Sequence, residues 1–117
     1  MLLLREMNLK INSEKHGKVQ VVSFSGKILS DSDLEKLNEP GLIESSNIVF
    51  DLSELTHINS SGINFIVKNL TRSRIENGEL ILCGLKGNVQ KIFELSKVNS
   101  LFSIFDSKNE SINYFSK

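Results

Sequence analysis

The chain has 117 residues, of which 39% are hydrophobic and 24% charged, and its 14 basic residues balance its 14 acidic residues. This length predicts a single domain over residues 1–117, because it suffices for one compact core and is too short for two. A balanced charge without a run of Lys and Arg argues against a protein that holds nucleic acid or an anionic membrane by bulk electrostatics.

The hydropathy pattern predicts neither a membrane span nor a signal peptide. No segment approaches the roughly 20 apolar residues that cross a bilayer. At the start of the chain, Leu2, Leu3 and Leu4 are followed by Arg5 and Glu6, and this apolar run is too short for a signal peptide. The single cysteine, Cys83, excludes an internal disulfide, which fits a reducing compartment. We therefore expect a cytoplasmic protein without membrane insertion.

Two apolar runs near the start predict a β-hairpin. Segments 9–12 and 19–24 show partial alternation of apolar and polar residues, which is typical of half-buried strands. The polar stretch 15–18 between them contains a glycine and is typical of a turn. Gly26 is expected to mark the exit from the second strand.

After the hairpin, helices and strands are expected to alternate. Several N-cap candidates in 30–33 precede Leu34 and Leu37, and Pro40-Gly41 stops this first helix early. Further strands are expected at 48–52, 80–83 and 102–105, and further helices at 61–77, 87–97 and 110–115. This order predicts an α/β fold, in which a mixed, mostly parallel sheet opens with a β-hairpin and is covered by about four helices.

No catalytic or metal-binding constellation emerges from the sequence. Cys83 ends a buried apolar run and is expected to pack as a small hydrophobe rather than as a reactive thiol. His16 and His57 fall in presumed loops without metal-ligand spacing. The glycines at 84 and 87 lack the spacing of a phosphate-binding loop. We therefore predict neither an enzyme nor a cofactor.

The segment 51–63 is expected to run from a buried strand, through a loop, into an amphipathic helix. In parallel sheets the functional edge lies beyond the carboxyl ends of the strands. Asn59, Ser60 and Ser61 all suit an N-cap, and a helix needs only one. Free amides and the positive dipole end at this position suit a serine or a phosphate, and Gly62 admits close approach of other backbone. On spacing alone, capping is favoured over function.

The chain resembles the STAS family, the domain of anti-sigma factor antagonists and of sulfate transporter tails. The family signature is a strand reading D-L-S, then D-S-S-G-[LI] at the start of a helix. Here the strand motif is Asp51-Leu52-Ser53, and the second motif reads Asn59-Ser60-Ser61-Gly62-Ile63. Segment 22–28 is similar to the family's second strand and its glycine, and the resemblance extends over residues 8–115.

The resemblance implies a partner switch centred on Ser60. In family antagonists the first serine of the motif is phosphorylated by a partner that is both anti-sigma factor and serine kinase, and a specific phosphatase resets the switch. The unmodified protein binds the anti-sigma factor and frees the sigma factor, whereas the phosphorylated form does not. Partner contacts are accordingly expected at Asn59, Ser60, Ser61 and Gly62.

Two features leave alternatives open. Asn59 stands where the family has aspartate, so phosphorylation of Ser60 would be slower or absent if the carboxylate helps to position the hydroxyl. The alternatives are a STAS module of another cytoplasmic signalling or transporter complex, and a small nucleotide- or anion-binding protein. Phe65 lies about 200° around the helix from Ile63. It is interpreted either as a partner-facing anchor or as a residue that packs on a neighbouring element.

Overall fold

The structure is a computed structural model that describes residues 9–116. A β-hairpin is followed by alternating helices and strands, as the sequence predicts. The elements are β1 (Leu9–His16), β2 (Val19–Ile28), α2 (Asp31–Leu37), β3 (Asn47–Ile58), α3 (Ser60–Ile75), β4 (Glu79–Cys83), α4 (Gly87–Leu95), the 3₁₀ turn η1 (Asn99–Leu101), β5 (Ser103–Phe105) and α5 (Lys108–Phe115).

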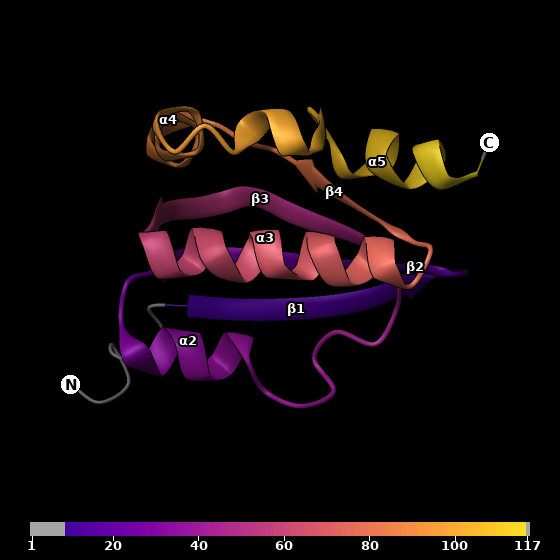
Figure 1. The fold of residues 1–117 in the computed structure, drawn as a ribbon, viewed down its shortest axis with the longest axis horizontal. Coiled ribbons are helices and arrows are strands. Elements are labelled where there is room, and N and C mark those ends of the chain that lie inside the picture. The colour runs from indigo at the N-terminus through magenta and orange to yellow at the C-terminus, as the bar shows by residue number, and fades with distance from the viewer. Residues whose placement is uncertain (1–8, 117) are drawn as a thin grey trace.

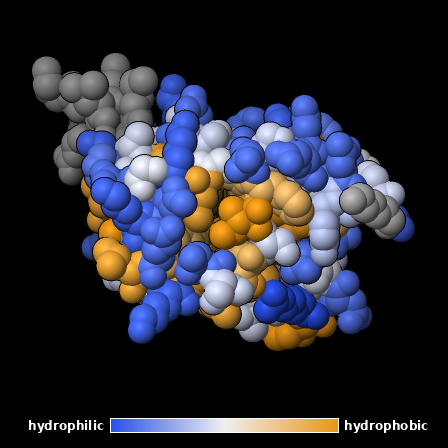
Figure 2. All heavy atoms as spheres, turned by 90° about the horizontal axis from the view of Figure 1, so that it is seen from above, coloured by the Kyte–Doolittle hydropathy of each residue, from blue (hydrophilic) through white to orange (hydrophobic). Residues whose placement is uncertain are grey.

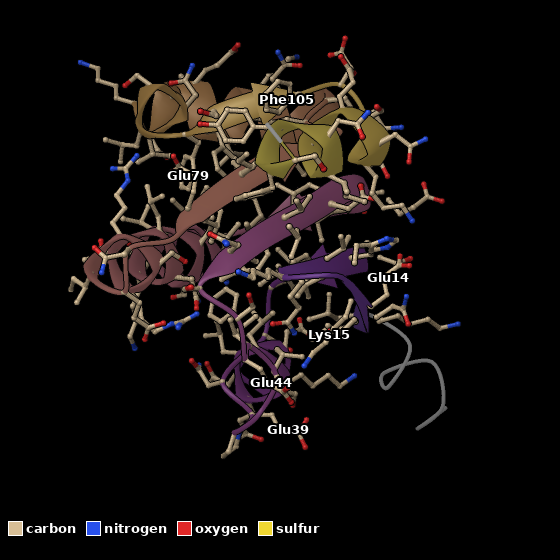
Figure 3. All side chains as sticks on the ribbon, turned by 90° about the vertical axis from the view of Figure 1, so that its right-hand side faces the viewer. Glu14, Lys15, Glu39, Glu44, Glu79 and Phe105 are labelled. Atoms are coloured by element: carbon tan, nitrogen blue, oxygen red, sulfur yellow. The ribbon has the colours of Figure 1, made fainter. Side chains whose placement is uncertain are left out.

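The five strands form one sheet in the order β1-β2-β3-β4-β5. Only β1 and β2 are antiparallel, and the other neighbours run parallel, so the predicted mixed, mostly parallel sheet is confirmed. Helices α2, α3 and α4 pack on one face and α5 on the other (Figures 1 and 3). This arrangement puts the start of α3 at the carboxyl ends of the parallel strands.

Alternating side chains divide the core between the two faces of the sheet. In β2, Val22 and Phe24 point into the larger cluster under α2, α3 and α4, whereas Val19 and Val21 join the smaller cluster under α5. The same alternation separates Leu82 from Cys83 in β4. Strands buried on both faces explain why these segments read as apolar runs.

The first three strands are longer than predicted. The polar stretch 13–16 belongs to β1, so His16 ends a strand rather than lying in a loop. Gly26 does not mark the exit of β2, which continues to Ile28 past two irregularities in its pairing with β3. At these irregularities β3 carries extra residues, and its buried positions change to a spacing of three. Segment 53–58, predicted as a loop and containing His57, is therefore strand.

Strand β5 forms one edge of the sheet, and β1 forms the other. Figure 2 looks onto the side of the molecule that carries α4, β5 and α5, where apolar atoms gather between hydrophilic side chains. Exposed apolar residues of α4, η1 and β5 include Leu95, Leu101 and Ile104, respectively. Within residues 9–116, no helix is long and apolar enough to cross a membrane. The apolar start of the chain lies outside the described residues, and the single domain over 1–117 stays a prediction.

Helix α3 ends in a tight turn that depends on Asn77 and Gly78. Asn77 has a φ of 66° and its N–H donates to Arg74 O, while the N–H of Gly78 donates to Ser73 O at 2.7 Å. This pair of bonds closes the end of the helix. A Cβ at Gly78 would lie 1.9 Å from the carbonyl oxygen of Ser46, so this position admits only glycine.

We predict that Gly78→Ala lowers the free energy of unfolding by about 1–3 kcal/mol, because the new methyl group collides with the Ser46 backbone. Asn77→Gly is the matched control, since glycine tolerates the positive φ and should leave stability equal or higher. Urea unfolding of the variants measures both changes. Equal stability of Gly78→Ala and the parent chain would contradict the packing described.

An ion pair joins helix α5 to β1, the edge strand opposite β5 in the sheet. Lys108 Nζ lies 3.0 Å from Glu14 Oε1, and the same carboxylate lies 3.1 Å from His16 Nε2. Figure 3 shows Glu14 on the side of the sheet that α5 occupies. The hydrogen bond from Lys108, and then that from His16, lower the pKa of Glu14 below its ordinary value of 4.5.

Because the folded-state pKa of Glu14 is lowered, the pair stabilises α5 fully above pH 4.5 and is lost as the pH falls through the lowered pKa. We expect the α5 amides to lose hydrogen-exchange protection in that range, after correction for the intrinsic exchange rate. In Lys108→Gln this pH dependence should disappear. Protection of α5 that falls equally with pH in both chains would be inconsistent with this role.

Candidate functional site

The candidate site is the entrance of α3, where β3 ends at Ile58 and the helix begins at Ser60. One residue, Asn59, joins the two elements. Because β2 and β3 run parallel, the end of β2 and the start of α2 lie beside this junction. The site is thus built from the ends of two neighbouring strands and the helices that follow them.

Asn59 makes hydrogen bonds in two directions. Its side-chain Oδ1 accepts from the Gly62 N–H at 2.9 Å, which caps α3. Its Nδ2 donates to the carbonyl oxygen of Leu29 at 3.1 Å, and its backbone N–H donates to Ile28 O at 3.1 Å. A carboxylate at this position would cap the helix but lacks a donor for Leu29 O. The asparagine therefore fastens the β2–α2 connection to the start of α3.

The β2–α2 connection is also held from its other side. The buried carboxylate of Asp33 accepts from the backbone N–H groups of Leu29 and Ser30 at 3.0 and 2.9 Å. Burial opposes ionisation of Asp33, but the hydrogen bonds from Leu29 and Ser30 outweigh it and lower the pKa of Asp33. With both backbone groups of Leu29 fixed, its side chain remains 51% exposed.

Leu29 and Asp33 were not among the predicted site residues. Asp33 appeared only as one of several N-cap candidates, whereas the cap of α2 is Ser30, with Asp33 completing a capping box. The spacing of Ser30 and Asp33 is the sequence signal for that box. No local signal indicated that the Leu29 carbonyl would meet Asn59, because this contact joins residues far apart in the chain.

Ser60 and Ser61 are both exposed on the first turn of α3. Since Asn59 caps the helix, neither serine hydroxyl is needed for capping, and neither makes a hydrogen bond within the described residues 9–116. The first turn of α3 carries no acidic residue. The site therefore offers a free hydroxyl at the positive end of a helix dipole.

Gly62 lies buried beneath the two serines. A Cβ on Gly62 would lie 2.6 Å from Ile58 Cγ1 and 2.9 Å from Ile28 Cγ2. The close approach expected at Gly62 is confirmed, but its neighbours are side chains from the ends of two strands rather than other backbone. This packing sets how closely α3 approaches the sheet.

Phe65 is a core residue. Its ring is 7% exposed and stacks on Phe50 with centroids 6.0 Å apart. Phe50 in turn meets Phe24 edge-on at 5.0 Å. Of the two interpretations of Phe65, packing on a neighbouring element is confirmed and the partner-facing anchor is wrong, because the ring is buried against Phe50 of the sheet.

Of the other residues considered for chemistry, Cys83 and His16 lie on other strands, whereas His57 lies two residues before Asn59 at the end of β3. Burial, and next the nearby Asp51 carboxylate, raise the pKa of the Cys83 thiol to about 12, so Cys83 is a protonated core residue. His16 contacts Glu14, and His57 Nδ1 lies 2.9 Å from Thr56 Oγ1. Between residues 9 and 116 the structure has no cluster of His, Cys, Asp and Glu that could hold a metal ion.

Comparison with curated proteins finds relatives over part or most of the chain. The chain is 36% identical over 61 residues to BtrV of Bordetella bronchiseptica, named as a candidate anti-sigma factor antagonist. That match covers 52% of this chain and 53% of BtrV, about half of each. The chain is also 26% identical over 106 residues to the anti-sigma F factor antagonist of Paenibacillus polymyxa, covering 87% of this chain and 91% of that one.

Solved structures share the fold. The anti-sigma factor antagonist SpoIIAA in its unphosphorylated form superposes with a TM-score of 0.79 at 18% identity, covering 92% of this chain and 96% of that one. The phosphorylated form of the Bacillus protein SpoIIAA gives 0.69 at 17% identity, covering 91% of this chain and 99% of that one. The family model of the STAS domain matches residues 10–111. The chain belongs to the STAS domain family.

Proposed function

We propose that this chain is an anti-sigma factor antagonist that binds an anti-sigma factor with serine kinase activity and is switched off by phosphorylation of Ser60. A phosphatase that acts on phosphorylated Ser60 resets the switch. Ser60 carries this proposal, because its hydroxyl is exposed at the entrance of α3 and makes no hydrogen bond to any of the described residues 9–116. The names of the relatives give the same general role. The role is regulatory rather than enzymatic, and it would be exerted in the cytoplasm.

The charge of a phosphate explains how the same fold would have two binding states. Phosphorylation adds about −1.5 to −2 charge and three acceptor oxygens to Ser60. The start of α3 tolerates this charge, since no acidic residue occupies its first turn and its dipole favours an anion. A partner that packs against Leu29, Ser60 and Ser61 would instead have to bury the phosphate charge, or would be repelled by it. A penalty of about 3 kcal/mol lowers affinity more than a hundredfold.

Asn59 is compatible with this switch. Its amide side chain bonds to Gly62 and Leu29 and leaves the Ser60 hydroxyl unengaged. We therefore expect the partner kinase, rather than residue 59, to align that hydroxyl for transfer. Asparagine at position 59, in place of the family's aspartate, also favours a second candidate function. In it the chain is a STAS module that binds its partner in another cytoplasmic complex without being phosphorylated.

We predict that Ser60→Glu weakens binding to the co-isolating anti-sigma factor about a hundredfold, whereas Ser60→Ala binds like the parent chain. Isothermal titration calorimetry with the purified partner measures both. Ser100→Glu is the matched control, because it places the same charge on an exposed serine of η1, outside the entrance of α3, and it should bind like the parent chain. Unchanged binding of Ser60→Glu, or phosphate transfer to Ser60→Ala, would remove Ser60 from the switch.

A second prediction concerns the junction itself. Asn59→Ala should lower the free energy of unfolding by about 1–2 kcal/mol, because the cap of α3 and the bond to Leu29 O are both lost. Asn59→Asp keeps the cap and should lose less. Urea unfolding measures stability, and hydrogen exchange should show a looser 28–30 segment in both variants. An unchanged 28–30 segment in Asn59→Asp would contradict the role given to the amide.

A further inference from the structure

Leu29 combines an exposed apolar side chain with a backbone that is held from both sides. It is 51% exposed, yet its N–H donates to the buried carboxylate of Asp33 at 3.0 Å, and its carbonyl oxygen accepts from Asn59 Nδ2 at 3.1 Å. A single exposed leucine is ordinary on a protein surface. Leu29 differs because side chains from the first turn of α2 and from the cap of α3 fix its position before any partner arrives.

The position of Leu29 places it next to the proposed switch. Its carbonyl bonds to Asn59, the residue that directly precedes Ser60. The β2–α2 connection and the start of α3 lie at the same end of the molecule (Figure 1). The other large apolar side chains exposed within residues 9–116 lie at the last residue of α3 and on α4, η1, β5 and α5: Ile75, Leu95, Leu101, Ile104 and Tyr114. A partner that covers Ser60 therefore meets Leu29 as its apolar contact.

The two segments that meet at this position are uncharged. Segments 28–30 and 58–67 contain no Asp, Glu, Lys, Arg or His, and the charged residues Lys27 and Asp31 flank the first of them. The centres of protein interfaces are depleted of charged residues in the same way. A fixed backbone also reduces the conformational freedom that the leucine loses on binding. The complementary surface is therefore an apolar pocket with an uncharged, hydrogen-bonding rim.

We propose that Leu29 is the apolar anchor of the contact with the anti-sigma factor, and that its side chain enters an apolar pocket of that protein whose rim covers Ser60. The proposal rests on the function proposed above, because it takes the anti-sigma factor as the occupant. It also gives phosphorylation its effect. A partner seated on Leu29 excludes water from Ser60 and offers no counter-charge, so a phosphate there is left buried and unpaired.

Calorimetry with the purified anti-sigma factor tests the anchor. Leu29→Ala should weaken binding about tenfold, because apolar area is lost from the contact. Leu29→Asn, which is polar, should weaken it at least as much. Leu95→Ala is the matched control, since this leucine of α4 is 78% exposed and lies outside the entrance of α3. The urea midpoints should stay at the parent value, because both leucines are exposed. Parent-like binding of Leu29→Ala, or an equal loss in Leu95→Ala, would overturn the proposal.

A double-mutant cycle with Ser60→Glu tests whether the anchor seats the partner over the switch. The loss of affinity in the double variant should fall short of the product of the two separate losses, because a partner without its anchor leaves the glutamate hydrated. Independent, multiplying losses would place Leu29 and Ser60 in separate contacts and overturn the proposal.

The outcomes also separate the anchor from the proposed function. If Leu29→Ala binds like the parent chain while Ser60→Glu does not, the anchor is wrong and the switch stands. If Leu29→Ala binds the anti-sigma factor more weakly but Ser60 carries no phosphate in native cells, the anchor is supported and the switch is contradicted.

Discussion

The amide side chain of Asn59 connects three parts of the molecule: the end of β3, the start of α3 and the loop that follows β2. Oδ1 caps the helix at Gly62, and Nδ2 holds the carbonyl of Leu29. Residues distant in sequence thereby form one ordered surface. Because Asn59 satisfies the orphan amide of Gly62, the serine hydroxyls beside it are available to a partner.

Asn59 caps the helix and Ser60 keeps its hydroxyl exposed, and the proposed function depends on this separation. Asn59, Ser60 and Ser61 compete for one capping position, and the structure gives it to Asn59. Ser60 is then an exposed hydroxyl on a rigid element, at the end of the helix where a negative charge costs least. The residue that caps the helix and the serine proposed as the switch are adjacent but distinct, so a phosphate on Ser60 would alter binding without unfolding the domain.

Much of this architecture was predictable from local patterns. The α3 stripe at Ile63, Ile66 and Leu70 and the apolar strand 80–83 were correctly interpreted, because regular periodicity reports burial directly. The end of β3 was missed, since two irregularities in its pairing break the alternation on which strand prediction depends. The contact of Asn59 with Leu29 was also beyond the sequence, and for Phe65 the sequence left burial as one of two interpretations. Both depend on how α2 and the β2–α2 connection come to lie against α3.

Phosphosite mapping by mass spectrometry, on the chain isolated from its native cells, tests the central claim most directly. Ser60→Ala, expressed in the same cells, is the control. The account predicts a single phosphate at Ser60 that is absent from the variant, which would show that asparagine at position 59 permits transfer. Absence of phosphate at Ser60 across growth and stress conditions, or phosphate on another residue, would contradict the switch and favour a binding module that acts without modification.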